Sequence, residues 1–155
     1  MRGLLDVREE RMASDPEPRL VVESDPDPAL NRFLEDRLYE FNVRTTGITD
    51  GKLLAVLLRG PDGAIVGGAH GWTWGGTCCL RSLFLPAGMR NRGHGTGIMR
   101  AIEREAVARG CEQIILQTHS FQAPGFYRRL GFAVIGAVDD YPHGHQYLTM
   151  LKRLG

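Results

Sequence analysis

Long hydrophobic runs, cysteines and an excess of either charge are scarce in this 155-residue sequence. No apolar stretch approaches the ~18 residues of a membrane-spanning helix, and the N-terminal residues carry too many charges for the core of a signal peptide. A formal net charge of +1 offers neither the basic surface of a nucleic-acid-binding protein nor a field that binds membranes. We therefore expect a cytoplasmic protein whose partners are neither nucleic acid nor membrane.

The three cysteines do not make a disulfide framework, and two of them, Cys78 and Cys79, are adjacent. There is no C-x-x-C pair, and His143 with His145 is too little for zinc, so no metal site is expected. The length and the 43% hydrophobic content suit one globular domain. Residues 1–17, rich in Arg, Glu, Asp and Pro, are expected to be a flexible N-terminal extension, and residues 18–155 a single domain.

The first half of the sequence predicts a strand, a helix and three further strands. Val21 and Val22 indicate the first strand. Asp27 and Pro28 are typical of a helix start, and the helix should run to about residue 42. Turn residues then separate strands expected at residues 52–59, 64–74 and 77–85. The apolar stripe of the helix is expected to lie in the core: Leu30, Phe33, Leu34, Leu38 and Phe41.

The second half predicts a helix at residues 96–109 and a strand at 112–118. Because that helix is the crossover, the strand should pair parallel with residues 77–85. A short helix at residues 123–130, closed by Gly131, and an antiparallel pair at 132–138 and 146–152 complete the order.

The stretch from Leu83 to Gly110 organises the chain. The apolar run Leu83, Phe84 and Leu85 enters a turn of glycine and arginine, which opens into a helix. Glycines leave backbone N–H groups unobstructed there, and two guanidinium groups and the positive end of a helix dipole lie beside them. These features predict a site for phosphate or pyrophosphate. One face of the helix carries Ile98, Met99, Ile102 and Ala106, and Gly110 suits its left-handed cap.

Two common phosphate-binding motifs fail in this turn. The spacing of Gly88 and Gly93 fits a P-loop, but His94-Gly95 follows where Lys and Ser or Thr are required. The dinucleotide pattern G-x-G-x-x-G also fails, because its last position falls on a residue other than glycine in either register. A nucleotide-binding module is therefore disfavoured.

The remaining pattern is R-x-x-G-x-G, and through it the sequence resembles the GNAT acetyltransferases. Two registers fit, one beginning at Arg90 with Gly93 and Gly95, the other at Arg92 with Gly95 and Gly97. The first is preferred because it follows Leu85 by five residues and puts an apolar pair and an acid where the family's helix usually has them.

A second segment supports the resemblance. Phe126-Tyr127-Arg128-Arg129-Leu130-Gly131-Phe132 is similar to the family's common Leu-Tyr-x-x-x-Gly-Phe segment and lies one helix and one strand after the loop. The order of elements matches the family from about Arg19 to the C-terminus. The implied fold is a mixed α/β (α+β) architecture of the GNAT type, with a central, mostly antiparallel twisted sheet of six to seven strands, one parallel pair, and flanking helices.

The resemblance implies an N-acetyltransferase that moves an acetyl group from acetyl-CoA directly to a primary amine of a small molecule or peptide. If residues 77–85 diverge from 112–118, unpaired backbone groups near Phe84 and Leu85 can bind the pantetheine arm and polarise the thioester carbonyl. The residues expected to contact acetyl-CoA are Leu83, Phe84, Leu85, Arg90, Asn91, Arg92, Gly93, His94, Gly95, Thr96 and Tyr127.

For catalysis, the family's tyrosine corresponds to Tyr127, a candidate proton donor to the departing thiolate; a core aromatic is the alternative. The strand where many relatives place a carboxylate reads TCCLRSLFL and has no acid. His70 and His119 are the candidate bases instead. A covalent intermediate on Cys78 or Cys79 is disfavoured, because strand cysteines are usually buried hydrophobes.

The acceptor is the least determined part. His70, Trp72 and Trp74 share one strand face by alternation and form either an acceptor wall or plain packing. The run Asp139-Asp140-Tyr141 in the last loop either attracts an ammonium group or is simply solvated, as acidic loops usually are. The missing strand carboxylate keeps a non-catalytic acyl-CoA binder as the alternative function. Many proteins of this fold dimerise, which leaves a homodimer open, although no interface is identified.

Overall fold

The computed structural model describes residues 17–155. The chain divides into two compact units, with the boundary in sequence between residues 40 and 41. The prediction of an N-terminal extension lies almost wholly outside the described residues. The elements, in order, are α2 (Pro28–Thr46), β1 (Lys52–Arg59), β2 (Ile65–Trp74), β3 (Thr77–Phe84), η1 (Ala87–Met89), α3 (His94–Ala108), β4 (Gln113–His119), α4 (Pro124–Arg129), β5 (Ala133–Asp139) and β6 (Gln146–Arg153).

The predicted first strand is wrong. Residues 17–27 form neither helix nor strand, and Val21 and Val22 are exposed. Their β-branched side chains favour extended backbone, but a strand is stable only where neighbours pair with it and cover one face. No described residue pairs with this segment as a strand.

Helix α2 begins as predicted but ends four residues later than expected. The Asp27 carboxylate accepts a hydrogen bond from the Ala29 N–H at 2.8 Å, as an N-cap does, and Pro28 occupies the first turn. In the described structure α2 contains no buried residue, and the expectation that its apolar stripe is core stays a prediction. Periodicity identifies an amphipathic helix but does not specify the surface that covers it. The exposed side chains are Leu30, Phe33, Leu34, Leu38 and Phe41.

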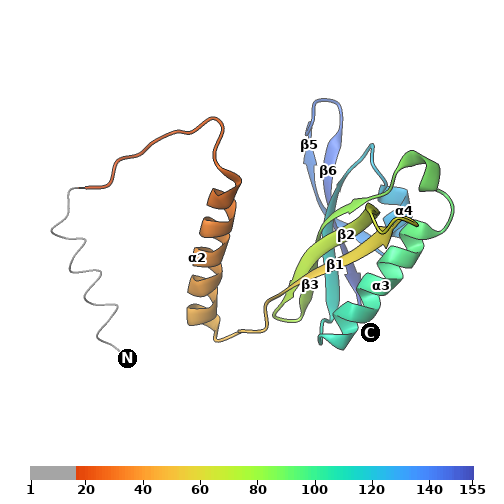
Figure 1. Cartoon of the computed structure of the whole chain (residues 1–155), viewed down its shortest axis with the longest axis horizontal. Helices are drawn as coiled ribbons and strands as arrows, with labels where there is room; N and C mark the ends of the chain where they lie inside the picture. Colours follow the sequence, from red (N-terminus) through yellow and green to blue (C-terminus); the bar gives the residue numbers. More distant parts are fainter. Residues whose placement is uncertain (1–16) are drawn as a thin grey trace. The chain divides into compact units, whose positions relative to one another are not determined.

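Six strands form one twisted sheet in the order β1-β2-β3-β4-β6-β5 (Figure 1). The β3–β4 pair is parallel and all other pairs are antiparallel, as predicted. Helix α3 connects the parallel strands and packs against β1, β2 and β4. The hairpin between β2 and β3 turns at Gly75 and Gly76, both with positive φ, as a two-residue hairpin turn requires.

Strands β3 and β4 separate after a short ladder. Their pairing begins with Thr77 opposite Gln113 and ends with Leu80 opposite Leu116, although both strands continue beyond it. At the same level, the register between β2 and β3 skips Arg81, which makes a β-bulge. Gly71 permits it, because a Cβ there would lie 1.9 Å from the Cys79 carbonyl oxygen. A bulge generally bends the strand that carries it, and this one lies at the level where β3 leaves β4.

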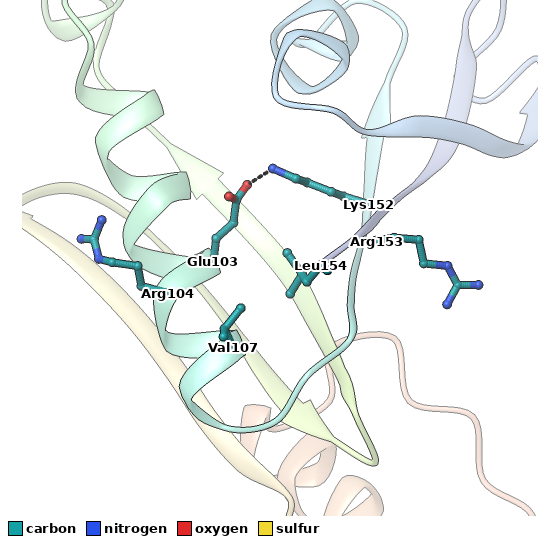
Figure 2. A pocket seen from close by; sticks show the side chains of 7 residues that line it. Glu103, Arg104, Val107, Lys152, Arg153 and Leu154 are labelled. Atoms are coloured by element: carbon teal, nitrogen blue, oxygen red, sulfur yellow. Dashed lines mark hydrogen bonds and ion pairs between the residues drawn. The ribbon is translucent and has the colours of Figure 1, made fainter.

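An ion pair joins α3 to the last strand. Lys152 Nζ on β6 lies 2.6 Å from Glu103 Oε1 on α3, and both side chains are about one-fifth exposed (Figure 2). The pair borders an open pocket of about 470 Å³ together with Val107 and Leu154. Since Glu103 belongs to the second half of α3, this pocket is remote in sequence from the glycine-rich turn before the helix.

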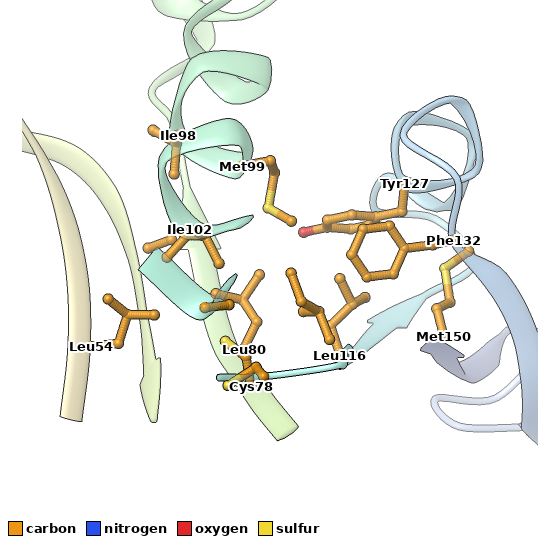
Figure 3. Packing of buried hydrophobic residues seen from close by; sticks show 14 of the residues in the cluster. Leu54, Cys78, Leu80, Ile98, Met99, Ile102, Leu116, Tyr127, Phe132 and Met150 are labelled. Atoms are coloured by element: carbon orange, nitrogen blue, oxygen red, sulfur yellow. The ribbon is translucent and has the colours of Figure 1, made fainter. Parts of the chain in front are cut away.

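One face of the sheet holds the core. The predicted α3 stripe is buried and packs on side chains of β1, β3, β4 and β6, while Tyr127 and Phe132 close the core beside α4 (Figure 3). Gly110 and Gly131 follow the helices with φ of +77° and +91°, which confirms them as left-handed caps. Within the described residues, no helix is both long and apolar enough to cross a membrane. The α3 residues of the core are Ile98, Met99, Ile102 and Ala106.

Candidate active site

The turn between β3 and α3 is shaped by backbone positions that favour glycine. Gly93 caps α3 with φ +82°, a left-handed conformation that side chains rarely adopt. Asn91 is also left-handed, at φ 57°, which asparagine tolerates better than most residues. Arg90 donates from Nε to the Leu85 carbonyl oxygen at 3.0 Å. The turn therefore has a defined backbone path from the end of β3 to the start of α3.

The first turn of α3 leaves backbone N–H groups without hydrogen-bond partners inside the helix. The bond from the Gly97 N–H to the Gly93 carbonyl oxygen is 2.9 Å, and no side chain caps this end. The amides of His94, Gly95 and Thr96 precede that bond, so helix geometry gives them no carbonyl partner within α3. Together with the helix dipole, such amides favour an anion.

The three glycines of the two candidate registers differ in whether a larger side chain would fit in their place. A Cβ on Gly95 would lie 3.2 Å from Phe126 Cζ and 3.4 Å from Leu85 Cδ1, so this position brings α3 close to α4. A Cβ on Gly97 would meet no atom within 4 Å, and its φ is not positive. Gly93 and Gly95 thus have structural reasons to be glycine, whereas Gly97 has none in the local packing.

Beyond Leu80, the edge of β3 that faced β4 has no strand partner in the ladder. Leu83 and Phe84 continue the pairing with β2 on the other edge, and Leu85 is buried where the strand ends. Extended backbone without a neighbour offers N–H and C=O groups to an extended ligand. The predicted divergence of the two parallel strands is therefore present, directly before the glycine-rich turn.

Tyr127 lies in the core between α4 and α3. It is 7% exposed, its ring meets Phe126 and Phe132 edge-on, and Figure 3 shows the ring pointing toward Met99. Burial raises the pKa of the Tyr127 phenol above its ordinary value of 10.0. The side chain is thus both a packed aromatic and a phenol that keeps its proton in neutral solution.

His70 and His119 lie on the face of the sheet opposite the core. His119 alternates with buried Thr118 on β4, and His70 alternates with buried Ala69 and Gly71 on β2. A hydrogen bond of 3.0 Å joins His119 Nδ1 to the Tyr141 carbonyl oxygen. Because a carbonyl only accepts, Nδ1 carries the proton, and Nε2 of the neutral ring keeps its lone pair. His70 Nε2 is instead 3.2 Å from the Ser82 hydroxyl.

The two tryptophans expected to line an acceptor wall lie on β2. Trp72 and Trp74 share the His70 face as predicted, and the Trp74 indole donates to the Ile48 carbonyl oxygen at 3.1 Å.

Cys78 is fully buried, and burial chiefly raises the pKa of its thiol to about 12. The pKa of the Cys79 thiol is raised for the same reason. Neither thiol has the lowered pKa of a nucleophile. Among residues 17–155, no cluster of three or more metal-binding side chains was found.

Sequence reasoning missed a group of rings beside His119. Phe121 stacks on the His119 ring with centroids 5.2 Å apart, and Tyr147 lies 4.5 Å from it. The pairing of His119 with Tyr147 follows from the β4–β6 register, which the sequence does not specify.

An open-edged parallel pair ahead of a glycine turn and a helix N-terminus defines the class of acyl-CoA-dependent acyltransferases. Residues 6–132 match the family model described as the acetyltransferase (GNAT) family. The chain belongs to this family and is an N-acetyltransferase, and the family implies an acyl-CoA cosubstrate and an acceptor.

The chain is also similar to named relatives. It is 29% identical over 127 residues to the acetyltransferase Atu2258 of Agrobacterium fabrum, covering 82% of this chain and 93% of that protein. It is 32% identical to the blasticidin-S acetyltransferase of Streptomyces morookaense, covering 72% of this chain and 85% of that protein. A crystal structure of an acetyltransferase from Bacillus cereus matches 86% of this chain and 98% of its own at 26% identity, with a TM-score of 0.71. The predicted GNAT fold is thereby confirmed.

Proposed function

We propose that this enzyme transfers an acetyl group from acetyl-CoA to a primary amine of a small molecule or peptide, by direct attack while both substrates are bound. The observation that carries the proposal is the separation of β3 from β4 after Leu80, immediately before the amides that open α3. The similarity to an enzyme named for blasticidin S supports an acceptor of small size.

The glycine-rich turn is proposed to hold the pyrophosphate of acetyl-CoA. The amides of Gly93 to Thr96 would donate to its oxygens, and the dipole of α3 favours the negative charge. Arg92, exposed in the turn, would add a guanidinium, while Arg90 holds the turn against Leu85. Asn91 and His94 are proposed contacts of the same ligand, because they belong to the same turn.

The free edge of β3 is proposed to pair with the pantetheine arm. The backbone of Leu83, Phe84 and Leu85 continues past the last β3–β4 pair, so amide groups of the arm can replace the missing strand neighbour. A backbone N–H there would also polarise the thioester carbonyl, an effect worth ~3 kcal/mol in comparable oxyanion sites.

Two proton transfers complete the reaction. His119 Nε2 would take the proton that the amine loses as its nitrogen bonds to the thioester carbon. Tyr127 would give its phenolic proton to the departing sulfur, since burial keeps the phenol protonated. His119 lies on the face of the sheet opposite the core, and Tyr127 lies in the core, so the two proton transfers would take place on different sides of the sheet. His70 is the second candidate base, although its Nε2 already contacts Ser82.

The proposal is tested by following free-thiol release from acetyl-CoA with a panel of primary amines, alongside calorimetric binding of acetyl-CoA. We expect binding and turnover with at least one amine. Binding without turnover on every amine would favour the non-catalytic acyl-CoA binder, and an absence of binding would overturn the proposed site. Displacement of bound CoA by ATP would revive the nucleotide-binding module.

A further inference from the structure

A cluster of aromatic rings surrounds the end of β4. It joins the segment after β4 to the turn between β5 and β6, which are far apart in sequence. His119 is its centre, with ring centroids 5.2 Å from Phe121, 5.3 Å from Tyr141 and 4.5 Å from Tyr147. His145 meets Phe121 edge-on at 4.9 Å. We call these five residues the ring cluster.

The ring cluster is fixed by backbone hydrogen bonds. Tyr141 accepts the His119 Nδ1–H through its carbonyl oxygen. Ser120 and Gln146 exchange two bonds, from the Ser120 N–H to the Gln146 carbonyl at 2.8 Å and from the Gln146 N–H to the Ser120 hydroxyl at 3.0 Å. The β5–β6 turn is therefore held against the end of β4, and the rings keep their positions relative to the proposed base.

Two rings of the cluster offer large apolar surfaces to a ligand. Phe121 is 54% exposed and Tyr141 is 55% exposed, whereas His119 and Tyr147 are half-buried. The His119 and Phe121 rings are nearly parallel, at an interplanar angle of 9°. Phe121 and Tyr141 therefore offer exposed ring surface in direct contact with His119, and aromatic side chains favour stacked or edge-on contacts with a flat ring.

The acidic residues of the same turn have other partners. Asp139 Oδ1 accepts from the Gln146 side-chain amide at 2.7 Å, and Asp140 Oδ1 accepts from the Gly144 N–H at 2.8 Å. His143 approaches the second oxygen of Asp140 at 3.7 Å. These carboxylates organise the turn and remain exposed, so the surface beside the rings is acidic as well as aromatic, which suits a ligand that combines a flat ring with an ammonium group.

We propose that Phe121 and Tyr141 bind the acceptor, and that the acceptor is an arylalkylamine: a flat aromatic ring joined to a primary amine by a short alkyl chain. The inference rests on the proposed function, because it assigns the acceptor side of the same site. Phe121 and Tyr141 are specificity-determining residues, and both rings contact His119, the proposed base.

The test compares 2-phenylethylamine with n-hexylamine, an apolar amine without a ring, at saturating acetyl-CoA. We expect kcat/KM for the aryl amine to exceed that for the alkyl amine by tenfold or more. Phe121→Ala should remove most of this preference, and Phe121→Leu, which keeps apolar bulk without a flat ring, should remove it as well. Both should leave the KM of acetyl-CoA unchanged. Ile135→Ala on β5 is the control, since Ile135 is 56% exposed and outside the ring cluster.

Each failure is distinguishable. Equal kcat/KM for the two amines in the wild type, or no effect of Phe121→Ala, would overturn the acceptor assignment and leave the proposed function standing. If no amine is acetylated, the proposed function fails. Calorimetry of 2-phenylethylamine with the enzyme–CoA complex then tests the acceptor subsite by itself. Binding that Phe121→Ala abolishes would support the subsite, and an absence of binding would overturn the subsite. Circular dichroism confirms that the variants are folded.

Discussion

Arg90 Nε donates a hydrogen bond to the Leu85 carbonyl oxygen at 3.0 Å, so the first arginine of the glycine-rich turn holds the end of β3. We expect Arg90→Ala to raise the KM of acetyl-CoA about fivefold, since a hydrogen bond of this kind contributes ~1 kcal/mol. Arg90→Lys should behave alike, because lysine has no donor at the Nε position. Arg100→Ala, at an exposed site in α3, is the control. Wild-type KM in Arg90→Lys would show that charge alone matters.

Gly93 and Gly97 distinguish the two registers of the R-x-x-G-x-G motif. Gly93→Ala places a side chain at φ +82° and should cost ~1 kcal/mol or more of folding stability while raising the KM of acetyl-CoA. Gly97→Ala enters open space inside a helix and should stabilise the enzyme by roughly 0.5–1 kcal/mol without changing that KM. Thermal unfolding and steady-state kinetics measure both. A raised KM in Gly97→Ala alone would favour the register beginning at Arg92.

Tyr127→Phe removes only the phenolic oxygen from a buried ring. Because that oxygen is the proposed proton donor, kcat should fall by ~10²-fold or more while the KM of acetyl-CoA stays near the wild-type value. Burial raises the pKa of Tyr127 above 10.0, so ionisation of this phenol should depress kcat only above pH 10. Unchanged turnover in Tyr127→Phe would remove the residue from the mechanism and leave it as a core aromatic.

His119 and His70 are compared directly by alanine substitution. His119→Ala should lower kcat by ~10²-fold or more, as expected for a lost general base. His70→Ala should have a smaller effect, because His70 contacts Ser82 on the neighbouring strand. Pre-steady-state and steady-state kinetics at fixed pH, with saturating acetyl-CoA, measure the two effects. A larger loss in His70→Ala would transfer the role of base to His70.

Cys78 should make the enzyme less stable in alkali. Its pKa is about 12 in the folded protein and near 9.0 in an unfolded chain, chiefly because burial disfavours the thiolate. The folded state therefore holds a proton that the unfolded state releases, and the contribution to stability, complete below pH 9, declines as pH rises toward 12. The slope is roughly 1.4 kcal/mol per pH unit. Urea titrations between pH 8 and 10.5 should show a shallower decline in Cys78→Ala, and equal slopes would contradict the assignment.

Several helix boundaries were predictable because their signals are local. Asp27 with Pro28 specifies a helix start within a few residues, and Gly110 and Gly131 specify helix ends through their positive φ. The crossover helix between Thr77–Phe84 and Gln113–His119 requires parallel pairing, so even one long-range feature followed from the order of elements. Boundaries were mostly displaced by one or two residues, as helix and strand ends commonly are.

The acceptor side was not predictable from local patterns. The ring cluster depends on the register that puts Tyr147 opposite His119 and on a turn that returns Tyr141 to the same place. Neither is specified by residues near His119 in sequence. The strand expected at Val21 and Val22 failed for the related reason that β-propensity cannot supply a partner. Gly71 within a strand was a usable signal for the bulge and was not interpreted as one.

The sheet consists of two three-stranded parts, β1-β2-β3 and β4-β6-β5. Strands β3 and β4 join these parts, and they pair only from Thr77 to Leu80 of β3. If acetyl-CoA occupies the open remainder as proposed, it contacts both parts of the sheet, and it stabilises the folded state by RT ln(1 + L/Kd), where L is its free concentration. By the same linkage, a substitution at Cys79 or Ile115 that weakens the β3–β4 ladder would also lower the affinity for CoA, although neither residue contacts the proposed CoA position. Substitutions that weaken the β3–β4 ladder should therefore lower both the stability of the enzyme and its affinity for the cosubstrate.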